Sequence, residues 1–352
     1  MRKEIKKAPT IRFQEFTEDW EQRKLSNLVD FSKGSGYSKN DLVESGTPII
    51  LYGRLYTRYE TRISNVDTFV NALDNSVYSE GGEVIVPASG ETAEDISRAS
   101  VVGEKGIILG GDLNILMPRK EIYSVFLALT LSHGKQQREI SKVAQGKTIV
   151  HIHNDDLRKV DLLYPANEIE QKKIGQYFLN LDNLITLHQR KFDELKTAKT
   201  YFLQNMFPAK GEKVPRIRFH GFTGDWEQSK LGELGEIMTG STPSTSNSEY
   251  YSEDGIPWVT PTDINSQTIS DTPRKLSEEG MKVGRVVPSN TILCTCIASI
   301  GKNTLLTVKG SFNQQINCLT PNEYNDAYFL LTESVFWSNI MKRIAAVGTM
   351  QI

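Results

Sequence analysis

Two nearly identical ten-residue stretches lie 206 positions apart in this 352-residue chain. The first, FTEDWEQRKL, occupies residues 16–25, and the second, FTGDWEQSKL, occupies residues 222–231. Around them, residues 9–28 align without a gap on residues 215–234. Self-similarity at a fixed spacing is the signature of duplicated structural units. The repeat therefore predicts two modules that fold alike.

The residues inside the two modules differ much more than those at the edges. Similarity returns only near the end of each module, where VAQGKT (residues 143–148) resembles AAVGTM (residues 345–350). Both interiors run from short β-rich segments, bounded by Gly, Pro or Asn, to a segment with helical spacing, which predicts mixed α/β modules. A shared frame with different interiors favours two modules that bind different things. Neutral drift of a duplicated domain is the alternative explanation.

A long helix is predicted between the modules. Residues 167–208 contain no proline before Pro208, and no glycine follows Gly175 until Gly211. Apolar side chains recur there at alternating steps of four and three, which is the spacing of a coiled-coil seam. A single helix cannot bury such a stripe, so we expect it to pack against another helix; the alternative is an amphipathic helix lying on a globular core. The residues expected to contact the partner helix are Ile174, Phe178, Leu181, Ile185, Phe192, Leu195 and Phe202.

The predicted fold class is α+β, with two similar mixed α/β domains separated by a long coiled-coil-type helix. The predicted boundaries are 1–166 for the first domain, 167–208 for the helix and 209–352 for the second domain. The composition, 38% hydrophobic and 24% charged residues, is that of an ordinary globular protein. No apolar run approaches the roughly 20 residues that span a bilayer. Three cysteines are too few for a disulfide framework and favour buried free thiols in a reducing cytoplasm.

Sequence motifs of the common enzyme classes are incomplete in this chain. The QGKT at residues 145–148 has Ser141 where a phosphate-binding loop needs its first glycine. His151 and His153 have no further ligand at metal-binding spacing. No glycine-rich nucleotide-binding fingerprint follows a predicted strand. The sequence therefore predicts a non-catalytic protein without a metal or cofactor of its own, and a standalone enzyme is the least favoured class.

The stretch YGRLYTRYETR, residues 52–62, is the strongest candidate for contacts with nucleic acid. If it is extended, period two places Tyr52, Arg54, Tyr56, Arg58 and Arg62 on one face. Arg can grip phosphates or bind a guanine edge with two hydrogen bonds, and Tyr can contact phosphate or stack. A solvated strand face is the alternative. Together with the basic loop before it and a lysine near the module's end, the candidates are Lys33, Tyr37, Tyr52, Arg54, Tyr56, Arg58 and Lys147.

The second interior offers hydroxyl and amide side chains where the first has arginines. Asn and Gln can bind adenine with two hydrogen bonds, and Thr can reach phosphates or thymine methyl groups. Ordinary polar loops have a similar composition, so both interpretations stay open. The candidates in this module are Ser241, Thr242, Thr260, Thr262, Lys302 and Gln314.

The chain resembles the specificity subunit of type I restriction–modification systems. The resemblance rests on the W-E-Q-x-K-L that opens each module, on the module ends A-Q-G-K-T and V-G-T-M, and above all on residues 167–208, which are similar to the family's central helix over their whole length. It covers essentially the entire chain, with the interiors matching only loosely. It implies two target-recognition domains that read the two halves of a gapped site in double-stranded DNA, without catalysis by the chain itself.

The resemblance also implies partners and a location. Family members bind two adenine methyltransferase (modification) subunits, which carry S-adenosylmethionine, and through them restriction (endonuclease/translocase) subunits that use ATP and Mg²⁺, in the bacterial cytoplasm and without a membrane. The family closes with a second long helix packed antiparallel on the first, whereas this sequence stops at VGTMQI. We therefore expect that helix to be absent or supplied by another molecule. The alternative from a different class is a coiled-coil scaffold that binds proteins and no DNA.

Overall fold

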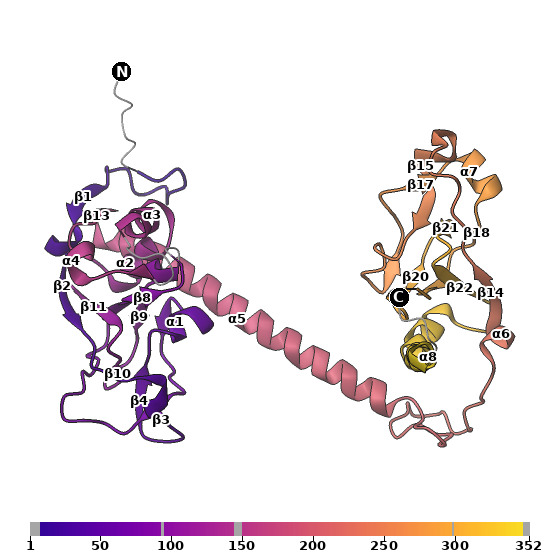
Figure 1. The fold of residues 1–352 in the computed structure, drawn as a ribbon, viewed down its shortest axis with the longest axis horizontal. Helices are drawn as coiled ribbons and strands as arrows, with labels where there is room; N and C mark the ends of the chain where they lie inside the picture. Colours follow the sequence, from indigo (N-terminus) through magenta and orange to yellow (C-terminus); the bar gives the residue numbers. More distant parts are fainter. Residues whose placement is uncertain (1–7, 93–94, 144–149, 298, 348–352) are drawn as a thin grey trace. The chain divides into compact units, whose positions relative to one another are not determined.

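The computed structural model describes residues 8–92, 95–143, 150–297 and 299–347. The chain divides into two compact units, Met1–Tyr201 and Phe202–Ile352 (Figure 1). Each unit contains mixed sheets and helices, and a long helix lies between the two sheet domains, which confirms the predicted α+β class. No helix among the described residues is long and apolar enough to cross a membrane.

The first unit is built on a five-stranded sheet with the order β2-β11-β7-β9-β5. Neighbouring strands are antiparallel except β9 and β5, which are parallel. The strands are β2 (Val29–Lys33), β11 (Leu113–Pro118), β7 (Val84–Pro87), β9 (Ser100–Val102) and β5 (Arg62–Ile63). A four-stranded sheet with the order β10-β4-β6-β3 contains β10 (Ile108–Leu109), β4 (Thr47–Ile50), β6 (Phe69–Val70) and β3 (Leu42–Val43). Two antiparallel pairs complete the unit: β1 (Glu21–Lys24) with β13 (Asp161–Tyr164), and β8 (Ser89–Gly90) with β12 (Val150–His151).

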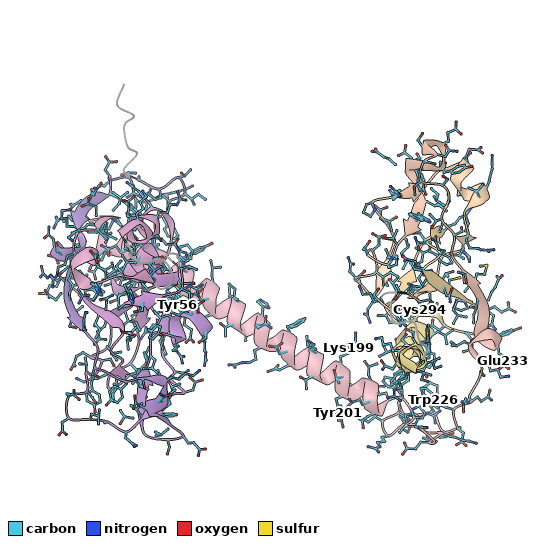
Figure 2. All side chains as sticks on the ribbon, in the orientation of Figure 1. Tyr56, Lys199, Tyr201, Trp226, Glu233 and Cys294 are labelled. Carbon is cyan, nitrogen blue, oxygen red and sulfur yellow. The ribbon has the colours of Figure 1, made fainter. Side chains whose placement is uncertain are left out.

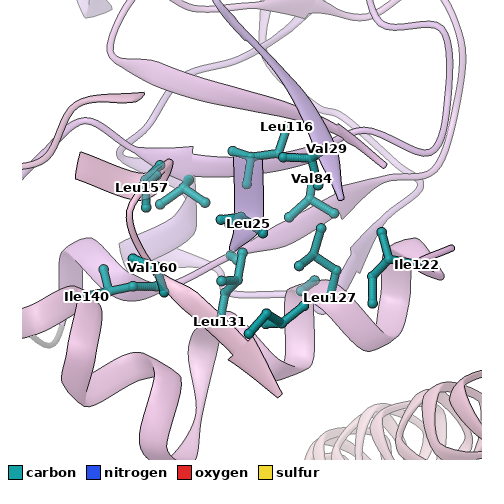
Figure 3. Packing of buried hydrophobic residues seen from close by; sticks show 14 of the residues in the cluster. Leu25, Val29, Val84, Leu116, Ile122, Leu127, Leu131, Ile140, Leu157 and Val160 are labelled. Atoms are coloured by element: carbon teal, nitrogen blue, oxygen red, sulfur yellow. The ribbon is translucent and has the colours of Figure 1, made fainter. Parts of the chain in front are cut away.

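The main core of the first unit lies between the five-stranded sheet and its helices. Leu127 of α2 (Ser124–Ser132) packs there with Val84 and Leu116 of the sheet (Figure 3). Leu25 from the repeated stretch and Val160 from near the end of the unit lie in the same core, so the edges of the module close one hydrophobic interior. The helices of this unit before the long helix are α1 (Arg54–Thr57), α2 (Ser124–Ser132), α3 (Gly134–Val143) and α4 (Asn154–Leu157).

The second unit repeats this architecture. Its five-stranded sheet has the order β14-β22-β19-β20-β16, again antiparallel except for the last pair. These strands are β14 (Gly235–Thr239), β22 (Ile316–Pro321), β19 (Thr291–Thr295), β20 (Asn303–Leu306) and β16 (Thr268–Ile269). A four-stranded sheet with the order β17-β15-β21-β18 contains β17 (Lys275–Leu276), β15 (Tyr251–Val259), β21 (Gly310–Phe312) and β18 (Val286–Val287). The further helices are α6 (Leu231–Leu234), α7 (Glu278–Val283) and α8 (Ala327–Val347). The matching strand order and direction of the two five-stranded sheets confirm the two similar modules predicted from the repeat, whereas the four-stranded sheets share a parallel pair (β4 with β10, β15 with β21) and differ in which edge carries the fourth strand.

The long helix α5 (Glu168–Asn205) has 38 residues and is roughly 57 Å long at 1.5 Å per residue. Its first turns are buried against the first unit. Glu170, only 1% exposed, accepts hydrogen bonds from Arg12 Nε (2.6 Å) and Nη2 (2.8 Å) and from Trp20 Nε1 (3.2 Å). Ile174 packs on the main core. The repeated edge of the first module therefore fastens the unit to the start of the helix.

Beyond its first turns the apolar stripe of α5 is exposed. The exposed fractions range from 37% for Leu181 to 67% for Ile185. Figure 2 shows side chains standing out along this part of the helix, among them Lys199 and Tyr201. The exposed members of the stripe are Phe178, Leu181, Ile185, Phe192, Leu195 and Phe202. Their packing against a partner helix stays a prediction.

Candidate nucleic-acid interface

Residues 52–62 do not form the extended strand that the sequence predicts. Strand β4 ends at Ile50, and α1 follows as a single helical turn in which Arg58 N donates to Arg54 O at 2.8 Å. The turn buries Leu55 completely, in a core with residues of both the five-stranded and the four-stranded sheet. Burial of this leucine and the local hydrogen bonds together outweigh the strand preference of the surrounding Tyr and Thr side chains. The prediction of one face with alternating Tyr and Arg is therefore wrong.

The helical turn groups the candidate side chains in two pairs. Residues four apart are neighbours on a helix surface. Tyr52 and Tyr56 accordingly contact each other edge to face, with ring centroids 6.0 Å apart. Arg54 and Arg58 likewise point to one shared partner, Asp67. The residues predicted to act together do remain close, at a spacing of four and not of two.

Asp67 joins the two arginines. Its Oδ1 accepts from Arg54 Nη1 and its Oδ2 from Arg58 Nη1, both at 2.9 Å. Arg54 Nη2 also donates to Glu60 Oε2 and to Asn65 O, each at 2.8 Å. The hydrogen bond from Arg54 holds the pKa of Asp67 below its usual value, so the carboxyl is a charged acceptor near neutral pH. The cluster is thus fixed by charge-assisted hydrogen bonds.

Two of the tyrosines are tied to the protein by their hydroxyl groups. Tyr56, labelled in Figure 2, donates its hydroxyl to Ser89 O, and burial raises the pKa of its phenol. Tyr37 shares a hydrogen bond with Ser76 Oγ and accepts another from Leu73 N at 2.9 Å. Their ring faces are the parts left for contacts with a ligand.

A cavity of about 610 Å³ brings four candidates of the first unit together. Tyr37, Tyr52, Arg54 and Arg58 line it, and the rest of the wall includes Asp67, Lys39 and residues 110–112. Two further candidates do not line this cavity: Tyr56 and Lys33, an exposed residue at the end of β2. The remaining candidate, Lys147, lies outside the described residues.

In the second unit, two of the polar candidates hydrogen-bond to each other across two loops. Thr242 Oγ1 donates to Gln314 Oε1. Ser241, next along the chain, accepts from Arg285 N at 2.6 Å through its Oγ. Lys302 is exposed on a different loop, directly before β20, and its backbone N donates to Thr295 Oγ1 at 3.0 Å.

The other two candidates of this unit form a turn. The Thr260 and Thr262 hydroxyl oxygens lie 2.9 Å apart. Thr260 Oγ1 also donates to Asp263 Oδ2 at 2.6 Å, and Thr260 N donates to the same oxygen at 2.8 Å. Local hydrogen bonds of this kind fix the loop that follows β15.

Equivalent backbone hydrogen bonds hold the candidate loops in both units. Three backbone hydrogen bonds of the first unit have counterparts of nearly the same length in the second unit. In each case the bonded residues lie at equivalent positions of the two folds. The pairs are Ser35 N–Leu109 O (2.9 Å) with Ser241 N–Phe312 O (3.0 Å), Gly110 N–Ile50 O (2.9 Å) with Asn313 N–Val259 O (2.9 Å), and Ala88 N–Asp112 O (2.8 Å) with Cys296 N–Gln315 O (2.9 Å). The Tyr and Arg candidates of one unit and the Thr and Gln candidates of the other therefore occupy corresponding loops of one frame.

A thiol lies beside these loops in the second unit. Cys296 is half-buried, whereas Cys294 and Cys318 are buried. A hydrogen bond with the Cys294 thiol lowers the pKa of Cys296 to about 7. Cys296 Sγ is also 3.5 Å from Cys294 O. The sequence predicts buried free thiols and does not single out Cys296, because its neighbours in space determine its pKa.

Sequence reasoning missed the carboxylates that organise the first cluster. Asp67 follows Arg54 by 13 residues, and nothing in the local sequence marks the pair. A charge-complementary stretch, with Glu60 and Asp67 after two arginines, is the one available signal. Within the described parts of the chain, no group of three or more His, Cys, Asp or Glu side chains is arranged to hold a metal ion.

Comparison with known proteins extends over both units. The family model of the type I restriction modification DNA specificity domain matches residues 17–197 and 223–352. The type I restriction enzyme HindI specificity subunit of Haemophilus influenzae is 32% identical over 129 residues, which cover 35% of this chain and 28% of that protein. The MjaIX specificity subunit of Methanocaldococcus jannaschii is 40% identical over 99 residues, 25% of this chain and 23% of that protein. The matches thus span about a quarter of the length of these relatives.

The fold is also similar to a solved structure. The crystal structure of a type I restriction–modification system S subunit from M. genitalium superimposes with a TM-score of 0.54 at 17% identity, covering 94% of this chain and 80% of the other. That similarity supports the architecture of two sheet domains and a long helix. Because the family model matches most of the chain, once in each half, the chain belongs to the type I restriction–modification DNA specificity family.

Proposed function

We propose that this chain reads DNA sequence for a type I restriction–modification complex, and that its two units recognise the two halves of a gapped site. The observation that carries the proposal is that the two units share a backbone framework but differ in the side chains on its loops. The same backbone hydrogen bonds hold equivalent loops, which present Tyr and Arg in one unit and Ser, Thr and Gln in the other. Arginine and amide side chains distinguish different base edges. Two units with the same backbone framework and different polar side chains are suited to recognising two different DNA sequences.

In this proposal the chain performs no catalysis. Two modification subunits with S-adenosylmethionine would methylate adenine, and restriction subunits with ATP and Mg²⁺ would act on unmodified DNA. Two similar units support two equivalent docking positions for copies of one subunit. The exposed apolar residues of α5 would pack against a partner helix, because burial of each large apolar side chain is worth about 1.5–3 kcal/mol.

The test is co-expression with a type I modification subunit from the same host, followed by mapping of methylated adenines across the host genome. We expect one gapped motif with two defined halves. Exchange of residues 29–142 for the interior of a related specificity subunit should change one half and leave the other intact. A complex that assembles but methylates no motif would instead favour the protein-only scaffold.

A further inference from the structure

Arg54 and Arg58 share one carboxylate but differ in access to solvent. The Arg54 side chain is 8% exposed and its two Nη atoms donate to Asp67, Glu60 and Asn65. The Arg58 side chain is 54% exposed, and its Nη1 donates to Asp67. A large ligand can therefore reach the Arg58 guanidinium without a rearrangement, whereas Arg54 would first have to leave its partners.

We propose that Arg58 is the residue with which the first unit reads a base edge, that Asp67 directs its guanidinium, and that Arg54 positions Asp67. This assignment rests on the proposed function. It separates two arginines that look equivalent in the sequence, and it adds a carboxylate that touches no DNA in the proposal.

The geometry leaves one edge of the Arg58 guanidinium for a ligand. With Nη1 engaged by Asp67 Oδ2 at 2.9 Å, the Nε and Nη2 hydrogens form a pair of nearly parallel donors. Glu60 Oε2 lies 3.9 Å from Nε, beyond hydrogen-bond distance. Two parallel donors match the O6 and N7 acceptors of guanine in the major groove. Fixing the side chain beforehand reduces the conformational entropy lost on binding.

The balance of charge favours a base edge over a phosphate. Arg54 and Arg58 are matched by Glu60 and Asp67 within the cluster. The other charged residues that line the cavity, Lys39 and Asp112, are of opposite sign. Binding to phosphate depends on net positive charge and on the release of counterions. A cluster whose positive and negative charges cancel contributes little to either. Directed donors in a cavity of about 610 Å³, beside the exposed ring of Tyr52, suit a neutral, planar base edge.

The experiment uses the complex of this chain with its modification subunit. Variants Arg58→Gln, Arg58→Lys and Asp67→Asn are compared with Arg119→Gln, which alters another exposed arginine of the first unit with a carboxylate partner, Asp30. Dissociation constants are measured for a duplex with the mapped motif and for duplexes in which each base pair is exchanged in turn, at several salt concentrations.

We expect both Arg58 variants to lose discrimination at one G·C pair of one half-site by about 5- to 150-fold, the range for a bidentate contact. Lysine keeps the positive charge but lacks the two parallel donors of a guanidinium. The loss of discrimination in Arg58→Lys should therefore resemble that in Arg58→Gln. Asp67→Asn should weaken discrimination at the same base pair. The second half-site, the salt dependence and the Arg119→Gln variant should stay as in the wild type.

Two results would overturn the assignment while the proposed function stands. One is wild-type discrimination at every base pair in Arg58→Lys, with the fold verified by an unchanged melting temperature. The other is an equal loss on all duplexes with a shallower salt dependence, which marks a phosphate contact. A wild-type complex that assembles but recognises no motif would refute the proposed function itself, and this assignment with it.

Discussion

Replacement of Gly175 by alanine should destabilise the junction between α5 and the first unit, although alanine is the better helix former. A methyl group at this position would lie 2.8 Å from Tyr123 Cε1 and 3.3 Å from Val125 Cβ. The helix itself would gain about 1 kcal/mol. Overpacking in a tight contact costs about 1–3 kcal/mol. The Tyr123 backbone is anchored, because its N donates to Gln171 Oε1 at 2.7 Å, so we expect a net loss of about 0–2 kcal/mol.

A double-mutant cycle isolates the contact. The chain has two units, so local unfolding is measured by hydrogen exchange in urea on peptides from α2 and the start of α5, where a global two-state analysis does not apply. In a Tyr123→Ala background the two closest contacts of the methyl group are removed and, of the three nearest atoms, only Val125 Cβ remains, so Gly175→Ala should stabilise by about 0.5–1 kcal/mol. If Gly175→Ala stabilises the wild-type background as much as it stabilises Tyr123→Ala, close packing at Gly175 is not what constrains this junction.

Three further predictions concern the helix and the second unit. Glu170→Gln should lower the melting temperature of the first unit, because it removes a buried charged acceptor of three hydrogen bonds, whereas Glu168→Gln, at an exposed site, should not. Alkylation of Cys296 should rise with pH around a midpoint of about 7, since only the thiolate reacts, while the other two cysteines stay slow in peptide mass spectrometry. Leu181→Asp with Leu195→Asp should abolish any self-association or modification-subunit binding seen in sedimentation; unchanged behaviour would remove the stripe from that interface.

The long helix could be predicted because its signals are local. Good helix formers, acidic residues in the first turn and Pro208 after the end act within a few residues of each other, and α5 indeed runs over Glu168–Asn205. The anchoring of its first turns could not be predicted in the same way. Glu170 meets Arg12 across 158 positions of sequence, and the acidic residue expected to favour the helix N-terminus is also the partner of a distant guanidinium.

The candidate cluster of the first unit shows where local signals fail. Tyr, Arg and Thr in alternation match a half-buried strand, yet Leu55 is fully buried and α1 forms around it. Which residues approach one another is then decided by Asp67, a group outside the stretch. Composition supplied the candidate residue types for the proposed DNA contacts. It could not tell that one arginine is enclosed and the other exposed, since both pair with Glu60 and Asp67 and only their burial in the folded unit separates them.

The loss of sequence similarity inside the modules has a physical reason in the bonds that hold the loops. Ser35 N–Leu109 O and its counterpart Ser241 N–Phe312 O join backbone to backbone, so side chains can change without removing them. The edges are constrained differently, because Leu25 lies in the core through its side chain. Side-chain packing therefore constrains a residue such as Leu25, while the interior loops keep these backbone hydrogen bonds with any compatible residue. Loops held by backbone hydrogen bonds can change their side chains without losing their positions. The proposed recognition of different DNA sequences requires this property.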